Sequence, residues 1–176
     1  MMAAGATLDF RRLWVAATPY ARFADEAQDL RGLWEGMYRR ARPPEWALDA
    51  ARARGSAVHL LVIAEDWCWD AANTVPPLAR LADEAGTVEL RIISRDQHPE
   101  VMDRYLTEGT RSIPIIIALS AGFEEIGHWG PRPAELQAWA KANKGTMEKK
   151  EFYAEMRRWH VRDGGESTLR EVLALL

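Results

Sequence analysis

Cys68 is the only cysteine of this 176-residue chain, and it follows a largely apolar run at residues 58–64. Such a run predicts a buried strand, and the residues after it predict a helix that begins at the cysteine. The first turn of a helix carries free backbone N–H groups and the positive end of the helix dipole, which favour a thiolate. We therefore expect an exposed Cys68 sulfur that can act as a nucleophile.

Three acidic residues oppose this effect, because Glu65, Asp66 and Asp70 all lie within three residues of the sulfur. At about 7 Å and an effective dielectric of about 40, each carboxylate would disfavour the thiolate by about 1 kcal/mol. The helix dipole contributes only about 0.3 to 2 kcal/mol in the other direction. Asp70 could equally use its charge to cap the helix end. The balance predicts a Cys68 pKa near the ordinary thiol value of about 8.5.

A dithiol oxidoreductase has a second cysteine three residues after the first, but position 71 of this chain is Ala71. Cys68 could therefore attack a disulfide, whereas no internal thiol could release the mixed disulfide that results. Two tryptophans flank the cysteine. We expect Trp67 to belong to the core and Trp69, at the tip of the loop, to be an exposed partner contact.

Composition narrows the function classes. A net charge of -3 with interspersed acids and bases implies neither nucleic-acid nor anionic-membrane binding, and no apolar stretch approaches the ~18 residues needed to span a bilayer. A single cysteine fits a reducing compartment, and we expect a cytoplasmic protein. The four histidines show no metal-ligand spacing to Cys68, so we predict no metal and no bound cofactor.

The chain length suits one domain, 1–176, in three parts. Residues 1–55 predict a helical extension and residues 146–176 two closing helices. Residues 57–143 alternate strand and helix in the order β-α-β-α-β-β-α. A β-α-β crossover makes its two strands parallel, and the final hairpin adds an antiparallel edge. The expected elements are strands at 57–64, 88–94, 113–119 and 123–128, and helices at 68–85, 99–106 and from about 130.

Local signals place the outer helices. Thr18-Pro19 predicts a helix start with proline in the first turn. Apolar residues at helical spacing from Leu30 to Tyr38 predict a helix that ends before two prolines, and a further helix is expected at 45–54. Thr168 and Glu171 have the spacing of a capping box, which predicts that the last helix begins there.

This order of elements, with a Trp-Cys pair at a strand-to-helix junction, resembles the thioredoxin fold over residues 57–143. Pro76 inside the helix and an Ile-Pro pair before the next strand strengthen the resemblance. More narrowly, residues 57–176 resemble a group of bacterial thioredoxin family proteins in which the second cysteine is typically alanine. The motifs that carry this are Glu65-Asp66-Trp67-Cys68, Asp70-Ala71, Arg95-Asp96, Met102-Asp103, Arg111-Ser112-Ile113-Pro114 and Trp129-Gly130-Pro131-Arg132-Pro133.

The resemblance implies an α/β, thioredoxin-like three-layer fold with a central mixed sheet of about four strands and additional helices at both ends. It also implies a cis Ile113–Pro114 bond facing the thiol, and a loop that lets Arg111 offset a nearby acid. One departure is Trp69, where that group usually has glycine, and its bulk restricts access to Cys68.

Two functions remain open. The first is monothiol thiol-disulfide exchange, in which Cys68 attacks a protein or small-molecule disulfide and glutathione or another small thiol resolves the product. The second is a binding module that keeps the scaffold and docks a partner at the surface of Trp69 and Pro114. An Fe–S cluster shared with glutathione ranks third, because the chain supplies one ligand of four. Substrate, partner and oligomeric state are not readable from the residues.

Overall fold

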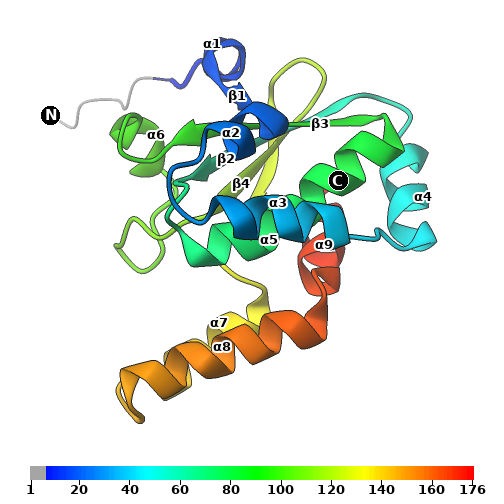
Figure 1. Cartoon of the computed structure of the whole chain (residues 1–176). Helices are drawn as coiled ribbons and strands as arrows, with labels where there is room; N and C mark the ends of the chain where they lie inside the picture. Colours follow the sequence, from blue (N-terminus) through cyan, green and yellow to red (C-terminus); the bar gives the residue numbers. More distant parts are fainter. Residues whose placement is uncertain (1–6) are drawn as a thin grey trace, which may run out of the picture.

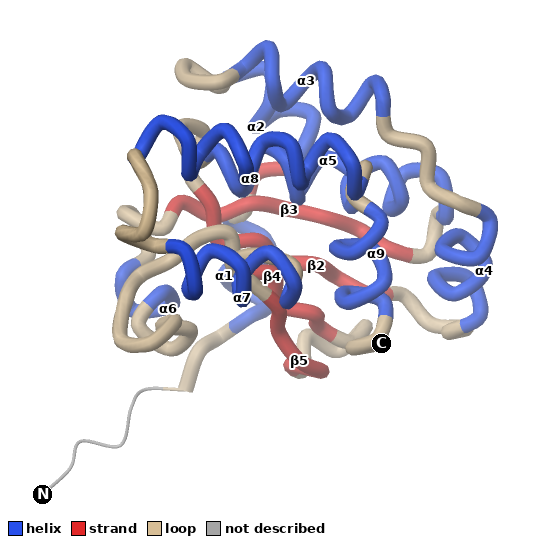
Figure 2. Tube along the Cα trace, turned by 90° about the horizontal axis from the view of Figure 1, so that it is seen from below, coloured by secondary structure: helices blue, strands red, loops and turns tan. Residues whose placement is uncertain are grey.

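The structure is a computed structural model, and it describes residues 7–176 as a five-stranded sheet between layers of helices (Figures 1 and 2). The strands are β1 (Thr18–Pro19), β2 (Val58–Ala64), β3 (Val88–Ser94), β4 (Ile115–Leu119) and β5 (Glu125–Trp129). The helices are α1 (Phe10–Ala16), α2 (Tyr20–Glu26), α3 (Arg31–Arg40), α4 (Glu45–Ala53), α5 (Trp69–Ala85), α6 (Pro99–Met102), α7 (Ala134–Asn143), α8 (Lys149–Asp163) and α9 (Glu166–Leu173).

The sheet has the strand order β1-β3-β2-β4-β5. β2 and β3 are parallel, while β4 and β5 run antiparallel to their neighbours, as the crossover and hairpin predicted. In the centre, Val62 of β2 pairs with Ile92 on one side and Ile116 on the other. Every residue of β2 and β4 is buried, because helices or loops cover both faces of these central strands. The continuous apolar runs in the sequence therefore correspond to the middle of the sheet.

The helix that follows β2 fixes the position of the cysteine. α5 packs against the sheet together with α9, and α3 lies outside α5, whereas α1 and α6 lie on the opposite side (Figure 2). Pro76 and Pro77 stand inside α5, and Gly86 ends it in the left-handed conformation. The order and layers agree with the three-layer α/β class expected from the sequence.

The helix expected to start at Thr18-Pro19 begins one residue later, after a short strand. Thr18 and Pro19 form the short strand β1, which pairs antiparallel with Ile92 and Arg91 of β3, and α2 begins only at Tyr20. Proline lacks an N–H group, so it fits an edge strand, where one backbone side needs no partner. The N-terminal extension thus adds an edge to the sheet, which has five strands rather than about four.

Two other boundaries were misplaced. α6 ends at Met102 instead of residue 106, and the following Tyr105 is buried, with its hydroxyl donating to Glu125 of β5. α9 begins at Glu166, so Thr168 is buried inside it and is not an N-cap. The Glu171 carboxylate instead accepts hydrogen bonds from the Trp129 indole and from the Ala134 N–H at the start of α7. The tertiary contact replaces the predicted local one.

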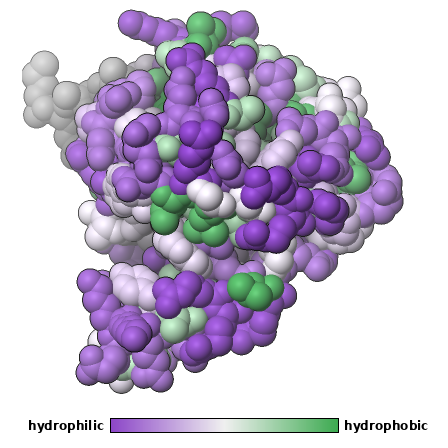
Figure 3. Space-filling view, in the orientation of Figure 1, coloured by the Kyte–Doolittle hydropathy of each residue, from purple (hydrophilic) through white to green (hydrophobic). Residues whose placement is uncertain are grey.

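α7 and α8 form an antiparallel pair that projects below the body of the molecule in Figure 1, joined where Trp139 stacks on Phe152 with ring centroids 5.3 Å apart. The surface over these two helices is mainly hydrophilic (Figure 3). In the described part of the chain, no helix combines the length and the apolar character needed to cross a membrane.

Candidate functional site

Cys68 is the N-cap residue of α5, at the carboxyl end of the central strand β2. Its sulfur accepts a hydrogen bond from the Ala71 N–H at 3.5 Å and donates one to the Ile113 carbonyl at 3.5 Å. The Ile113–Pro114 bond is cis. The fold thus brings together four of the site residues named from the sequence, although 45 positions separate Cys68 from Ile113.

The thiol is less accessible and less acidic than the sequence suggested. Cys68 is only 7% exposed, because it belongs to the buried hydrophobic core of the protein. Burial raises the pKa of the thiol to about 11, since desolvation penalises the thiolate; Asp70 raises it further, while the Ala71 N–H and Arg132 lower it. The expected exposure and the expected pKa near 8.5 were therefore both wrong.

Two of the three nearby acids have other partners. Glu65 accepts hydrogen bonds from the Ser94 hydroxyl at 2.6 Å and from the Asp96 N–H at 3.0 Å. Asp66 accepts from the backbone N–H groups of residues 28 and 29 at 2.7 and 3.2 Å. Both side chains tie the loop before Cys68 to its neighbours, and Asp70 is the carboxylate that raises the thiol pKa.

Asp70 lies in the first turn of α5 and is largely buried by two cationic or ionisable side chains. Arg132 donates to its Oδ2 from Nε at 2.9 Å and lies 2.8 Å from it through Nη2. His160 of α8 faces the other carboxylate oxygen, with Nε2 3.6 Å from Oδ1. These last two atoms are buried and have no hydrogen-bond partner among residues 7–176. The site therefore contains a compact charge cluster beside the thiol.

Sequence reasoning assigned the compensating cation to the wrong arginine. Arg111 makes two hydrogen bonds to Asp103, at 2.7 and 2.9 Å, in an exposed ion pair. Arg132 takes the predicted role, because the turn after Trp129 carries it to the start of α5. Its place in the Gly-Pro-Arg-Pro motif was the available signal. Nothing in the sequence linked His160 to the site.

Neither tryptophan has the exposure predicted for it, because Trp67 lies outside the core and Trp69 is only partly exposed. Trp67 is 46% exposed, and the Arg95 guanidinium lies 4.9 Å from its ring centroid. Trp69 is half-buried and packs edge-on against His160, with ring centroids 5.6 Å apart. The reason for the partial burial of Trp69 is α8, which covers the first turn of α5.

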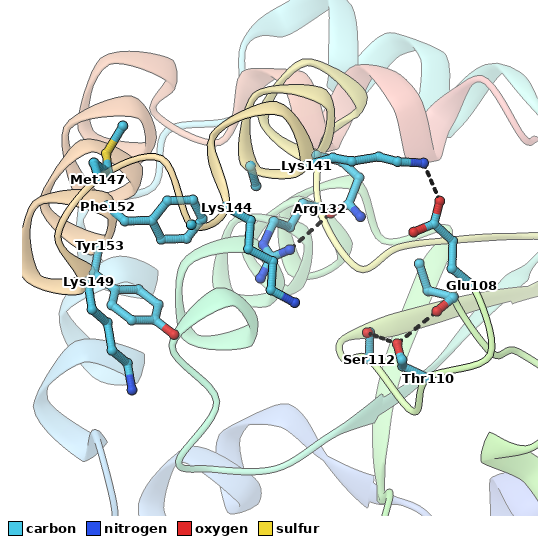
Figure 4. Close-up of a pocket in the computed structure, with 14 residues that line it drawn as sticks. Glu108, Thr110, Ser112, Arg132, Lys141, Lys144, Met147, Lys149, Phe152 and Tyr153 are labelled. Carbon is cyan, nitrogen blue, oxygen red and sulfur yellow. Dashed lines mark hydrogen bonds and ion pairs between the residues drawn. The ribbon is translucent and has the colours of Figure 1, made fainter.

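A cavity of about 580 Å³ lies between the 107–112 loop and the α7–α8 pair (Figure 4). This volume is within the range of small-molecule sites. Its polar and aromatic lining comprises the cations Arg132, Lys141, Lys144 and Lys149, the hydroxyls Thr107, Thr110 and Ser112, the acid Glu108, the amide Gln137, and the rings Phe152 and Tyr153. Sequence reasoning did not identify this cavity. Arg132 belongs to both the cavity and the Asp70 cluster.

Residues 7–176 contain no group of three or more His, Cys, Asp or Glu side chains that could hold a metal ion. No curated protein matches the chain. Among solved structures, it resembles a protein of unknown function from Pseudomonas aeruginosa, with a TM-score of 0.78 and 18% identity, over 96% of this chain and 97% of that one. An HIV epitope scaffold gives a TM-score of 0.76 at 18% identity, with the same coverage.

These likenesses show the fold. A family model described as Thioredoxin matches residues 17–155, which is most of the chain and extends beyond the 57–143 core into both flanking segments. The buried cysteine at the start of α5, the parallel β2–β3 pair and the β4–β5 hairpin all lie inside the matched region. The chain belongs to the thioredoxin family.

Proposed function

We propose that the protein carries out monothiol thiol-disulfide exchange through Cys68. The observation that carries this proposal is the position of the sulfur, which caps α5 and faces the carbonyl before Pro114. A disulfide that reaches this sulfur meets the backbone of the 113–114 segment on the other side. With Ala71 three residues on and no other cysteine in the chain, release of the product requires an external thiol.

The reaction balances without a cofactor. The Cys68 thiolate attacks one sulfur of a disulfide, forms a mixed disulfide and releases the other half as a thiolate, which takes up the proton lost by Cys68. A small thiol such as glutathione then attacks the mixed disulfide, forms a new disulfide and returns Cys68 to the thiol form. The sole-cysteine composition suits a reducing, cytoplasmic setting, where such small thiols are abundant.

A raised pKa of about 11 predicts slow exchange at neutral pH. On the order of one molecule in ten thousand would carry a thiolate at pH 7. The higher intrinsic nucleophilicity of a more basic thiolate offsets part of this loss.

The same burial favours a second candidate, a binding module without redox turnover. In that function Cys68 is a structural residue, and the exposed Trp67, with the Arg95 guanidinium over its ring, provides the contact surface.

The deciding experiment incubates the reduced protein with oxidised glutathione and follows the mixed disulfide on Cys68 by intact mass spectrometry. Exchange predicts an adduct that forms faster as pH rises from 7 to 10 and that added glutathione removes. Cys68→Ser must form no adduct. If wild type forms none at pH 10 over hours, the exchange proposal is wrong and the binding module remains.

A further inference from the structure

The cavity between the 107–112 loop and the α7–α8 pair is separate from the sulfur but adjoins its surroundings. Ser112 lines the cavity, and the next residue, Ile113, accepts the hydrogen bond of the Cys68 thiol. Arg132 lines it too and contacts Asp70, two residues after the cysteine. A molecule in this cavity would therefore contact Ser112 and Arg132, two residues that adjoin the surroundings of Cys68.

The charges of the lining select the ligand class. Four cationic side chains line the cavity, at positions 132, 141, 144 and 149, against one acid, Glu108. Glu108 is already paired with Lys141 across the cavity, and this hydrogen bond lowers the pKa of its carboxyl, so it remains ionised (Figure 4). Lys144 and Lys149 have no ion-pair partner in the described part of the chain. An anionic group is the natural complement for these two ammonium groups.

The remaining walls suit a small flexible ligand. Thr110 and Ser112 offer hydroxyl groups on the loop side, while Phe152 and Tyr153 offer ring surface on the α8 side (Figure 4). A volume of about 580 Å³ holds a molecule of tripeptide size.

We propose that this cavity binds the carboxylate-bearing part of an anionic low-molecular-weight thiol, the co-substrate that resolves the Cys68 mixed disulfide. The inference rests on the proposed function for the role of the ligand, whereas the binding itself does not require exchange. Lys144 and Lys149 contact the carboxylates, and the loop hydroxyls orient the peptide groups.

Binding is measured first with S-methylglutathione, which carries both carboxylates of glutathione but cannot form a disulfide. Calorimetry should show one site per chain, an affinity that weakens as salt rises, and the same affinity in Cys68→Ser. The double variant Lys144→Glu/Lys149→Glu should weaken binding about tenfold, because two favourable charges become unfavourable. Lys150→Glu is the matched control, since Lys150 is the exposed neighbour on α8 that does not line the cavity.

Three outcomes overturn the proposal. They are no binding of S-methylglutathione at millimolar concentration, an equal loss of affinity in Lys150→Glu, or unchanged affinity in the variant that lacks the lysines at 144 and 149. Inorganic phosphate is titrated in parallel. If phosphate binds with the same lysine dependence and S-methylglutathione does not, the site takes a phosphate and the thiol assignment is wrong.

A kinetic arm separates this inference from the proposed exchange. The mixed disulfide of Cys68 is resolved with glutathione or with uncharged 2-mercaptoethanol. The double lysine variant should slow resolution by glutathione about tenfold and leave 2-mercaptoethanol unaffected. Equal slowing with both thiols contradicts the cavity proposal. S-methylglutathione binding with no Cys68-dependent exchange in the wild type would instead reject the proposed function and leave the cavity as an anion site.

Discussion

The start of α5 and the α7–α8 cavity lie on either side of Arg132 and are built in opposite ways. Around Cys68, side chains and backbone exclude water, and Asp70 is paired with Arg132. In the cavity the surface is open, and Lys144 and Lys149 face solvent. Burial sets the chemistry of the first region, because desolvation outweighs each individual charge near the thiol. Net charge sets the chemistry of the second, because Lys144 and Lys149 are exposed.

The turn at Gly130 connects the two regions, and a substitution in this turn should have the largest effect on stability. Gly130 has φ +134, and a Cβ there would overlap the Pro114 carbonyl oxygen. Gly130→Ala should lower the free energy of unfolding by roughly 2 to 5 kcal/mol, from backbone strain and overpacking together. Thermal and denaturant melts measure this. Gly55→Ala is the control, since Gly55 also has positive φ but faces open space, and should cost only about 1 kcal/mol. Equal losses of stability in the two variants would contradict the close approach of Gly130 to the Pro114 carbonyl oxygen.

The buried thiol should show its environment in the pH dependence of alkylation. A pKa of about 11 means that the folded protein keeps the Cys68 proton where an ordinary thiol has lost it. The iodoacetamide rate should therefore rise about tenfold per pH unit from 7 to 10, about a thousandfold in total, without a plateau. A plateau below pH 9.5 would show that burial does not raise the pKa of the Cys68 thiol to about 11.

Ala71→Cys tests whether the site still has dithiol geometry. The Ala71 N–H contacts the Cys68 sulfur, so a thiol at 71 should lie close enough to bridge. We expect an intramolecular disulfide after mild oxidation and dithiol activity towards insulin, with a loss of about 1 to 3 kcal/mol in the reduced form, because residue 71 is fully buried. Mass spectrometry after alkylation detects the bridge. Two free thiols in the oxidised sample would argue against this geometry.

The smallest expected effect is on the alkylation rate of Cys68 when the acid on one side of it, Asp70, or the acid on the other side, Asp66, is neutralised. Asp70→Asn should lower the thiol pKa and speed alkylation at pH 8 by about threefold, less than a full unit because desolvation is the dominant cause. Arg132 loses its charged partner and, among the described residues, keeps only its hydrogen bond to Gln137, so stability should fall by roughly 1 to 3 kcal/mol. Asp66→Asn is the matched control, because its carboxylate is bound to residues 28 and 29. A similar increase in alkylation rate in both variants would mean that the total charge near Cys68, and not the position of each carboxylate, controls the pKa of the thiol.

Several features were predictable from local sequence. The largely apolar runs at 58–64 and 113–119 predicted strands, which the structure has at Val58–Ala64 and Ile115–Leu119, and the β-α-β order predicted the parallel pair. The junction of Val58–Ala64 with a following helix predicted where Cys68 stands. These features depend on residues close together in the chain, and burial of apolar side chains enforces them.

Only the tertiary structure decided the environment of the cysteine. The partial burial of Trp69 and the approach of His160 to Asp70 both depend on where α8 packs, about 90 positions after Cys68. The choice of Arg132 over Arg111 depends on a turn that follows β5. The sequence therefore determined the fold class and the position of the sulfur. The pKa of the Cys68 thiol and the adjoining cavity arise from desolvation and charge pairing, which exist only once distant segments meet.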